Sequence, residues 1–353
     1  MIKCVKGTVS ILSVLLMLFY ILSRAGQLAI PEDFDSNVWA SYYAEEDNTI
    51  NTVLIGSSAM YRYWLPTRAY EEQGFTSALL ATAGQDIRLI PYTMEETVKS
   101  QDVDLFVVEI RSAITRGNIE EVGSEKLNYR LEIFATGMKP SMTKFRMIQN
   151  LYDADESKKI ELMFPILMFH DNLLQYDKEE ILDRMDEKTD EYKMTRQKAT
   201  LKAKKRPKLK ASSERYLTDE ILGYVDDIEK KADELGVDVL LISTPFVANE
   251  KQGAMQLELD AYLDEQGYTY IDFNSGEDVI GLDYSTDFFD GRHTNVAGAK
   301  KFTSYMAKYL KENYNLKAEL DGEAKKSWTD ACEAWSLEEE EMMAQWRKSV
   351  EGK

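Results

Sequence analysis

The sequence predicts an α/β protein in which helices cover both faces of a doubly wound parallel sheet. Three observations indicate this fold. Five short apolar runs recur along the chain, and segments with helical periodicity separate them. The runs are nearly continuous rather than alternating, which is typical of strands that are buried on both faces of a parallel sheet. With 353 residues, of which 44% are hydrophobic, the chain can bury a core of this size.

The expected strands are short and rich in aliphatic residues: 52–55, 77–81, 104–110, 238–244 and 268–273. Helical patterns lie between and after them, at residues 87–100, 216–236 and 298–314. Because strands and helical patterns alternate, each helix is expected to connect one strand to a parallel neighbour. The main α/β domain is assigned to residues 51–316.

The interval at about 112–235 is much longer than a single crossover requires, so we expect a helical insertion there. Within it, residues 201–215 carry seven basic residues and one acid, which favours a mobile loop with solvated charges. Contact with lipid headgroups or an anionic cell-envelope polymer is the alternative. Residues 317–353 form a charged tail, in which Trp328, Trp335 and Trp346 indicate an amphipathic helix that docks on the body or on a partner.

The N-terminal residues 1–27 contain an uncharged, mostly apolar stretch at 8–22, with lysines before it and an acidic run after it. Extended back to Cys4, this stretch reaches roughly the 20 residues that span a bilayer. The charge asymmetry predicts a signal anchor that leaves the body outside the membrane. A cleaved signal peptide, with Ser23 and Ala25 before the cut, is the alternative. Residues 28–50 are expected to form an acidic linker.

Charge and composition exclude several classes of protein. The formal net charge is −19, which argues against nucleic-acid binding because phosphate recognition needs a basic face. Two cysteines exclude a disulfide-rich scaffold, and two histidines make a histidine-rich metal centre improbable. We therefore expect neither a metal nor another cofactor.

Two motifs carry residues of catalytic types. Gly56, Ser57 and Ser58 follow the first expected strand, at the sheet edge where open α/β folds place ligands. Asp290 and His293 precede the last expected helix, and a carboxylate three residues from an imidazole can orient it and stabilise its charged form. A serine becomes a good nucleophile when such a base accepts its proton. An ordinary helix cap is the alternative for the serines, and a surface histidine is the alternative for His293.

Together these motifs resemble those of the SGNH hydrolases, also called the GDSL family, over roughly residues 51–314. The resemblance implies a flavodoxin-like SGNH fold with Ser58 as nucleophile, His293 as general base and Asp290 as its orienting partner. It also implies an oxyanion hole that includes the N–H groups of Ser58 and Gly84, the latter in the ATAGQDI segment after the second strand.

The sequence departs from the family pattern in two places. Ser57 stands where the family has an aspartate, a change that resembles membrane-anchored relatives acting on envelope polymers. No asparagine matches the third oxyanion donor, and Arg111 follows the third strand instead. Arg111 is a candidate oxyanion or substrate ligand, although a salt bridge to Glu109 or a neighbour is the simpler expectation. His170 has apolar neighbours that favour a packed structural role, with a substrate-side role left open.

These observations predict a bacterial, membrane-anchored, extracytoplasmic serine esterase or O-acyltransferase with Ser57, Arg111 and His170 as candidate substrate-binding residues. The expected substrate is a polysaccharide or another envelope polymer, and a membrane acyl-transfer protein is a further candidate partner. An inactive SGNH-fold scaffold for cell-envelope assembly is the alternative. It would accommodate the missing asparagine, the basic segment and the tryptophan-bearing tail.

Overall fold

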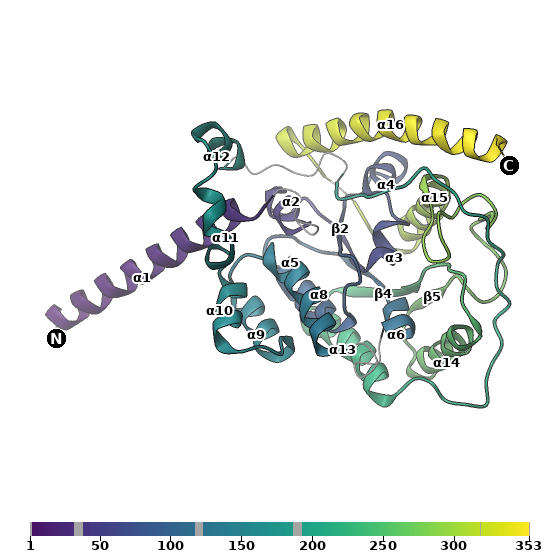
Figure 1. Cartoon of the computed structure of the whole chain (residues 1–353), viewed down its shortest axis with the longest axis horizontal. Helices are drawn as coiled ribbons and strands as arrows, with labels where there is room; N and C mark the ends of the chain where they lie inside the picture. The colour runs from purple at the N-terminus through teal and green to yellow at the C-terminus, as the bar shows by residue number, and fades with distance from the viewer. Residues whose placement is uncertain (1, 32–37, 117–122, 186–192, 318, 353) are drawn as a thin grey trace.

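A five-stranded, wholly parallel sheet forms the centre of the protein, with the strand order β2-β1-β3-β4-β5 (Figure 1). The computed structural model describes residues 2–31, 38–116, 123–185, 193–317 and 319–352. The strands are β1 (Thr52–Gly56), β2 (Ser77–Ala81), β3 (Leu105–Glu109), β4 (Asp238–Ser243) and β5 (Tyr270–Asp272). Both the predicted α/β class and the parallel sheet are confirmed, and the strand order is that of a flavodoxin-like fold.

All residues of β1, β2 and β3 are buried, whereas β4 begins with an exposed residue and β5 is half-buried. β1 is a central strand because it pairs with β2 on one side and β3 on the other. In this register Gly56 lies beside Ala81, and Ile55 lies beside both Leu80 and Val108. The residues that follow β1, β2 and β3 therefore emerge at the same edge of the sheet.

Helices form a layer on each face of the sheet. On one face α4 (Pro66–Gln73) packs against α15 (Val296–Asn313), and on the other face α5 (Ile90–Thr97) packs against α13 (Asp219–Leu235) (Figure 1). Local signals set the boundaries of α13, because Thr218 caps its start and Gly236 ends it in the left-handed conformation. The remaining elements of this core are α3 (Ser58–Tyr61), the 3₁₀ helix η1 (Ile87–Leu89) and α14 (Glu250–Gln266).

The long interval between β3 and β4 is helical in its first part and again at its end, in α13. Its helices before α13 are α6 (Arg111–Arg116), α8 (Ser124–Thr136), α9 (Met142–Leu151), α10 (Glu156–Met163), α11 (Ile166–Leu173) and α12 (Lys178–Met185). The described residues 193–216 then form neither helix nor strand and run along the outside of the body toward α13 (Figure 1). This segment is not an isolated loop, because its backbone bonds to the body at several points.

The N-terminal region contains two helices, α1 (Ile2–Ala29) and α2 (Val38–Ala44). α2 lies within residues 28–50, where a linker is expected, and its Trp39 and Tyr42 pack in the core. α1 projects from the body, and its C-terminal part contacts α11 (Figure 1). Within the described ranges, no helix has the length and apolar character needed to cross a bilayer. The anchor expected at residues 1–27 stays a prediction.

The C-terminal tail folds into one long helix, α16 (Gly322–Glu351), which lies across α4 and α15 (Figure 1). Trp328 and Trp335 are buried beneath it, and the indole N–H of Trp346 donates to the carbonyl of Thr286 at 2.9 Å. The tryptophans therefore attach the tail to the protein's own body.

Candidate active site

Ser58 lies where β1 ends and α3 begins. Gly56 closes the strand, and a Cβ at this position would lie 2.8 Å from the Cβ of Glu109 on β3, so only glycine allows this close approach of β1 and β3. Ser57 then caps α3, with its Oγ accepting the N–H of Ala59 at 3.3 Å. The helix cap is thus Ser57, which leaves the hydroxyl of Ser58 available at the carboxyl edge of the sheet.

His293 and Asp290 share a loop that leads into α15. One oxygen of Asp290 accepts the backbone N–H of Arg292 at 2.6 Å and that of His293 at 3.0 Å. Phe289 also donates its N–H to the carbonyl of His293 at 3.2 Å. The carboxylate therefore folds its own loop into a tight turn and fixes the backbone from which the imidazole projects.

The three candidate catalytic side chains form a continuous hydrogen-bonded chain. The Nε2 of His293 lies 2.8 Å from the Oγ of Ser58, which is 235 residues distant in sequence. The Nδ1 of the same ring lies 2.9 Å and 3.0 Å from the two carboxylate oxygens of Asp290. This is the geometry in which an imidazole can accept the serine proton while a carboxylate holds the opposite ring nitrogen.

The electrostatic environment favours a neutral imidazole beside an ionised carboxylate. Burial has the largest influence on the pKa of His293 and lowers it, Asp290 raises it, and the nearby charges of Arg111 and Arg62 lower it further. The net pKa lies below the ordinary value of 6.5. Burial raises the pKa of Asp290, but hydrogen bonds from His293 and Arg292 outweigh it, so the net pKa is lowered. At neutral pH the imidazole can therefore act as a base.

Two residues next to the imidazole were missed by sequence reasoning. The ring of Phe289 is stacked on His293 with a centroid distance of 5.3 Å and an interplanar angle of 9°. The guanidinium of Arg62 lies 5.3 Å from the Phe289 centroid and donates to the carbonyl of Arg196 at 2.7 Å. Their distance in sequence was the signal that could have identified them, because Arg62 lies four residues after Ser58 and Phe289 lies four residues before His293.

Arg111 is held by backbone carbonyls around the site. It is 4% exposed, and its guanidinium donates to Thr244 at 3.3 Å, Pro245 at 3.1 Å and Arg292 at 2.8 Å. The expected salt bridge to Glu109 is present, with Nε 3.9 Å from the carboxylate. Since Arg292 directly precedes His293, the Arg111 side chain connects the end of β3 to the histidine loop and fixes that loop in place.

Gly84 lies in the turn that follows β2, and β2 is the neighbour of β1. Its φ is +72°, a conformation that favours glycine. The turn is closed by a hydrogen bond from the N–H of Gln85 to the carbonyl of Thr82 at 3.2 Å. The Gln85 side chain also accepts the N–H of Thr82 at 2.9 Å. Gly84 therefore has a defined backbone at the same sheet edge as Ser58.

The position of His170 does not match the packed structural role that was expected for it. It lies on α11, its side chain is 63% exposed, and its Nε2 is 3.3 Å from the carboxylate of Asp171. The expectation of a packed histidine is wrong because α11 turns this residue to solvent while other residues of the helix face α1. Within the described part of the chain, no group of three or more His, Cys, Asp or Glu residues is arranged to hold a metal ion.

Comparisons with known proteins add little to what the geometry of the site indicates about function. No family model matches the chain, and no curated protein matches it. The chain is similar to a solved structure described as a "putative acylhydrolase" from Bacteroides fragilis, with 12% identity and a TM-score of 0.34. The similarity covers 76% of this chain and 90% of that one. A likeness at this level does not establish a common activity, so the chemistry is inferred from the site itself.

Proposed function

We propose that the protein is a serine esterase or O-acyltransferase of the SGNH type. The observation that carries this proposal is the hydrogen-bonded chain of Ser58, His293 and Asp290, in which every link is 3.0 Å or shorter. The lowered pKa of His293 supports the same conclusion, because a base must be unprotonated to accept a proton from serine.

The proposed reaction passes through an acyl-enzyme. The Oγ of Ser58 attacks the acyl carbonyl while its proton moves to the Nε2 of His293, and Asp290 stabilises the resulting imidazolium. The tetrahedral intermediate collapses, the C–O bond to the leaving alcohol breaks, and His293 returns the proton to the departing oxygen. Water or a sugar hydroxyl then gives its proton to His293 and attacks the acyl carbon. The bond from that carbon to the Oγ of Ser58 breaks, and His293 returns the proton to Ser58, so the acid or the acylated acceptor leaves a regenerated enzyme.

The N–H groups of Ser58 and Gly84 are the proposed oxyanion donors. Both lie at the carboxyl edge of the sheet, after neighbouring strands. Arg111 occupies the region after β3, where the family places an asparagine, and it bonds to backbone carbonyls. Loss of one oxyanion donor typically slows acyl transfer by about a hundred- to a thousandfold. Slow hydrolysis is therefore the expected behaviour, and acyl transfer to a bound acceptor is compatible with the same site.

The proposed location is the outer face of a bacterial membrane, and the proposed substrate is an exported polysaccharide or a related polymer. Exposed apolar side chains on α1 support membrane association; they include Val14, Leu16, Met17, Leu18, Phe19, Tyr20, Ile21 and Leu22. Ser57 is proposed to support the nucleophile as a helix cap rather than to bind substrate.

Trapping the acyl-enzyme tests the proposal. The full-length protein is mixed with p-nitrophenyl acetate, quenched in acid and measured by intact mass, with Ser58→Ala and the surface variant Ser212→Ala in parallel. We expect one acetyl group on the wild type and on Ser212→Ala, and none on Ser58→Ala. Acetylation of Ser58→Ala to the wild-type level would overturn the proposal. Equal absence of acetyl from all three folded proteins would favour the inactive scaffold.

A further inference from the structure

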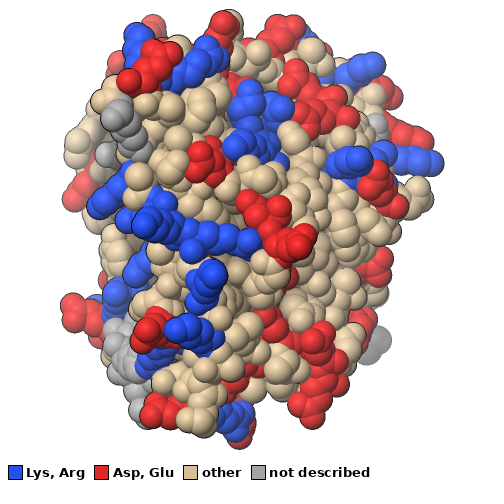
Figure 2. Space-filling view, turned by 90° about the vertical axis from the view of Figure 1, so that its right-hand side faces the viewer, with Lys and Arg blue, Asp and Glu red and all other residues tan. Residues whose placement is uncertain are grey.

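A strongly cationic segment passes beside the candidate active site. We name residues 196–210 the basic strap. It contains eight cationic residues and no acid, within a chain whose formal net charge is −19. They are Arg196, Lys198, Lys202, Lys204, Lys205, Arg206, Lys208 and Lys210. The strap lies on the face shown in Figure 2, where a band of Lys and Arg side chains is visible.

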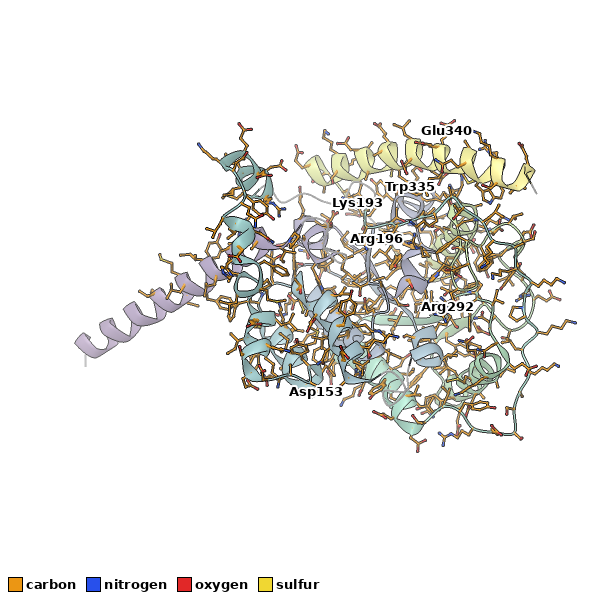
Figure 3. The ribbon with its side chains drawn as sticks, in the orientation of Figure 1. Asp153, Lys193, Arg196, Arg292, Trp335 and Glu340 are labelled. Carbon is orange, nitrogen blue, oxygen red and sulfur yellow. The ribbon has the colours of Figure 1, made fainter. Side chains whose placement is uncertain are left out.

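The first half of the strap is attached to the elements that carry the site. The backbone N–H of Lys202 donates to the carbonyl of Phe288 at 2.8 Å, and that of Lys204 donates to the carbonyl of Tyr284 at 2.7 Å. The carbonyl of Arg196 accepts from Arg62, which contacts the ring stacked on His293. Figure 3 labels Arg196 and Arg292 in this part of the molecule.

One strap side chain reaches the histidine loop itself. A Cβ built on Gly291 would lie 3.9 Å from the Cε and 4.0 Å from the Nζ of Lys204. Gly291 is two residues before His293. The ammonium group of Lys204 is therefore placed at the rim of the site, where it can contact a substrate whose acyl group lies at Ser58.

The cationic residues of the strap also have a regular spacing. Lys202, Lys204, Arg206, Lys208 and Lys210 occupy every second position. In extended backbone, alternate side chains lie on one side about 7 Å apart. Lys202, Lys208 and Lys210 are exposed and Leu209 packs against Gly253, which fits this alternation, whereas Lys204 and Arg206 are half-buried toward the body. Cations that recur at short intervals along the strap match a linear polymer with regularly repeated anions.

The lysines of the strap are not used for internal ion pairs. Lys202, Lys205, Lys208 and Lys210 are exposed, and none of them forms an ion pair with a carboxylate in the described part of the chain. Next to the strap, Arg206 and Lys208 line a hollow of about 410 Å³ together with Asn274 and Ser275. The protein thus holds several solvated cations beside a concave surface, although its formal net charge is −19.

We propose that the basic strap binds a linear polyanion, a polymer with repeated phosphate or carboxylate groups, and holds it as the acyl acceptor or acyl donor beside Ser58. This inference rests on the proposed function and names its substrate class. A lipid surface is disfavoured because the strap lies at the end of the body opposite to α1, which carries the exposed apolar side chains (Figure 1). Charge attraction of this kind is screened by salt.

Polymer binding by the full-length protein in detergent tests the inference. The probes are linear polyphosphate, polygalacturonate and neutral dextran, each fluorescently labelled, together with phosphatidylglycerol vesicles. The test variant is Lys202→Gln/Lys204→Gln/Lys208→Gln. The matched control is Lys158→Gln/Lys230→Gln/Lys308→Gln, which removes the same charge from exposed lysines elsewhere. Unchanged thermal midpoints establish that both variants are folded.

We expect at least one of the two anionic polymers to bind, dextran not to bind, and the strap variant to lose at least tenfold in affinity while the control changes less than twofold. Comparison of the two polymers assigns phosphate or carboxylate. Equal binding by both triple variants, or strap-dependent binding of vesicles alone, would overturn the inference. Ser58→Ala should retain polymer binding and lose acetylation, so failure of the proposed chemistry and failure of the proposed polymer site give different results.

Discussion

The two halves of the candidate site are held in place by different means. Ser58 follows the interior strand β1, and the close approach of β3 at Gly56 and the cap at Ser57 position it through the sheet and through its own helix. His293 lies in an irregular loop whose position depends on a residue far away in sequence, since Arg111 holds the carbonyl of Arg292. The position of Ser58 therefore depends on regular secondary structure, whereas the position of His293 depends on the contacts of a distant side chain.

The largest expected effect concerns the carboxylate of the histidine loop. Asp290→Asn removes the charge that holds Nδ1 and stabilises the imidazolium, so we expect acylation to slow by about a thousand- to ten-thousandfold. The measurement is the rate of inactivation by a fluorophosphonate. Asp283→Asn, a nearby loop carboxylate that bonds to Ser285, is the control. A loss below tenfold for Asp290→Asn would show that the histidine half does not depend on this residue.

The second prediction concerns the long-range support of the same loop. Arg111→Met removes three donors to backbone carbonyls, and we expect the inactivation rate at saturating probe to fall by about ten- to a hundredfold, by analogy with misplaced catalytic groups. Arg111→Lys should recover part of this rate. If only the probe concentration for half-saturation changes, Arg111 binds substrate and does not position His293.

The third prediction concerns the serine half. Gly56→Ala places a Cβ 2.8 Å from that of Glu109, so β1 and β3 must separate or Glu109 must shift. We expect a loss of about 1–3 kcal/mol in the free energy of unfolding, measured by urea denaturation. Gly223→Ala, a glycine within α13 with open space around it, is the control and should be neutral or stabilising. Equal stability of the two variants would contradict the packing account.

The smallest expected effect is a shift in pH dependence. Labelling requires a neutral His293, so in the wild type the rate should fall as the pH decreases through a value below 6.5. Arg62→Gln removes a positive charge that lowers the pKa of His293, so the acid limb should move to higher pH. The ratio of rates at pH 6 and pH 8 measures this shift. An unchanged ratio would exclude an electrostatic influence of Arg62.

The elements that local sequence patterns determine could be predicted from the sequence. The five strands followed from continuous apolar runs, and the candidate residues followed from a serine after the first strand and an aspartate–histidine pair before the last helix. The sequence did not predict the helix α2, the stacking of Phe289 on His293 or the attachment of the basic strap to the body. These features depend on contacts between residues far apart in the chain or on the orientation of an aromatic ring. Neither composition nor hydrophobic periodicity predicts such features.

The exposed position of His170 has a similar origin. Its sequence neighbours are apolar, but several of them, including Leu167 and Met168, are themselves exposed on α11. An apolar neighbourhood in sequence therefore did not imply burial in the fold. By contrast, Trp328 and Trp335 were expected to attach the tail to a surface, and α16 carries both into contact with the body.

The most direct test of the central claim is fluorophosphonate labelling of the full-length protein, followed by peptide mapping. Ser58→Ala and His293→Ala are measured beside the wild type, with thermal unfolding to establish that each is folded. The account predicts one adduct on Ser58 in the wild type and none in either variant, because the nucleophile needs both its own oxygen and the base. A folded wild type that takes no adduct, or an adduct that persists in His293→Ala at the wild-type rate, would contradict it.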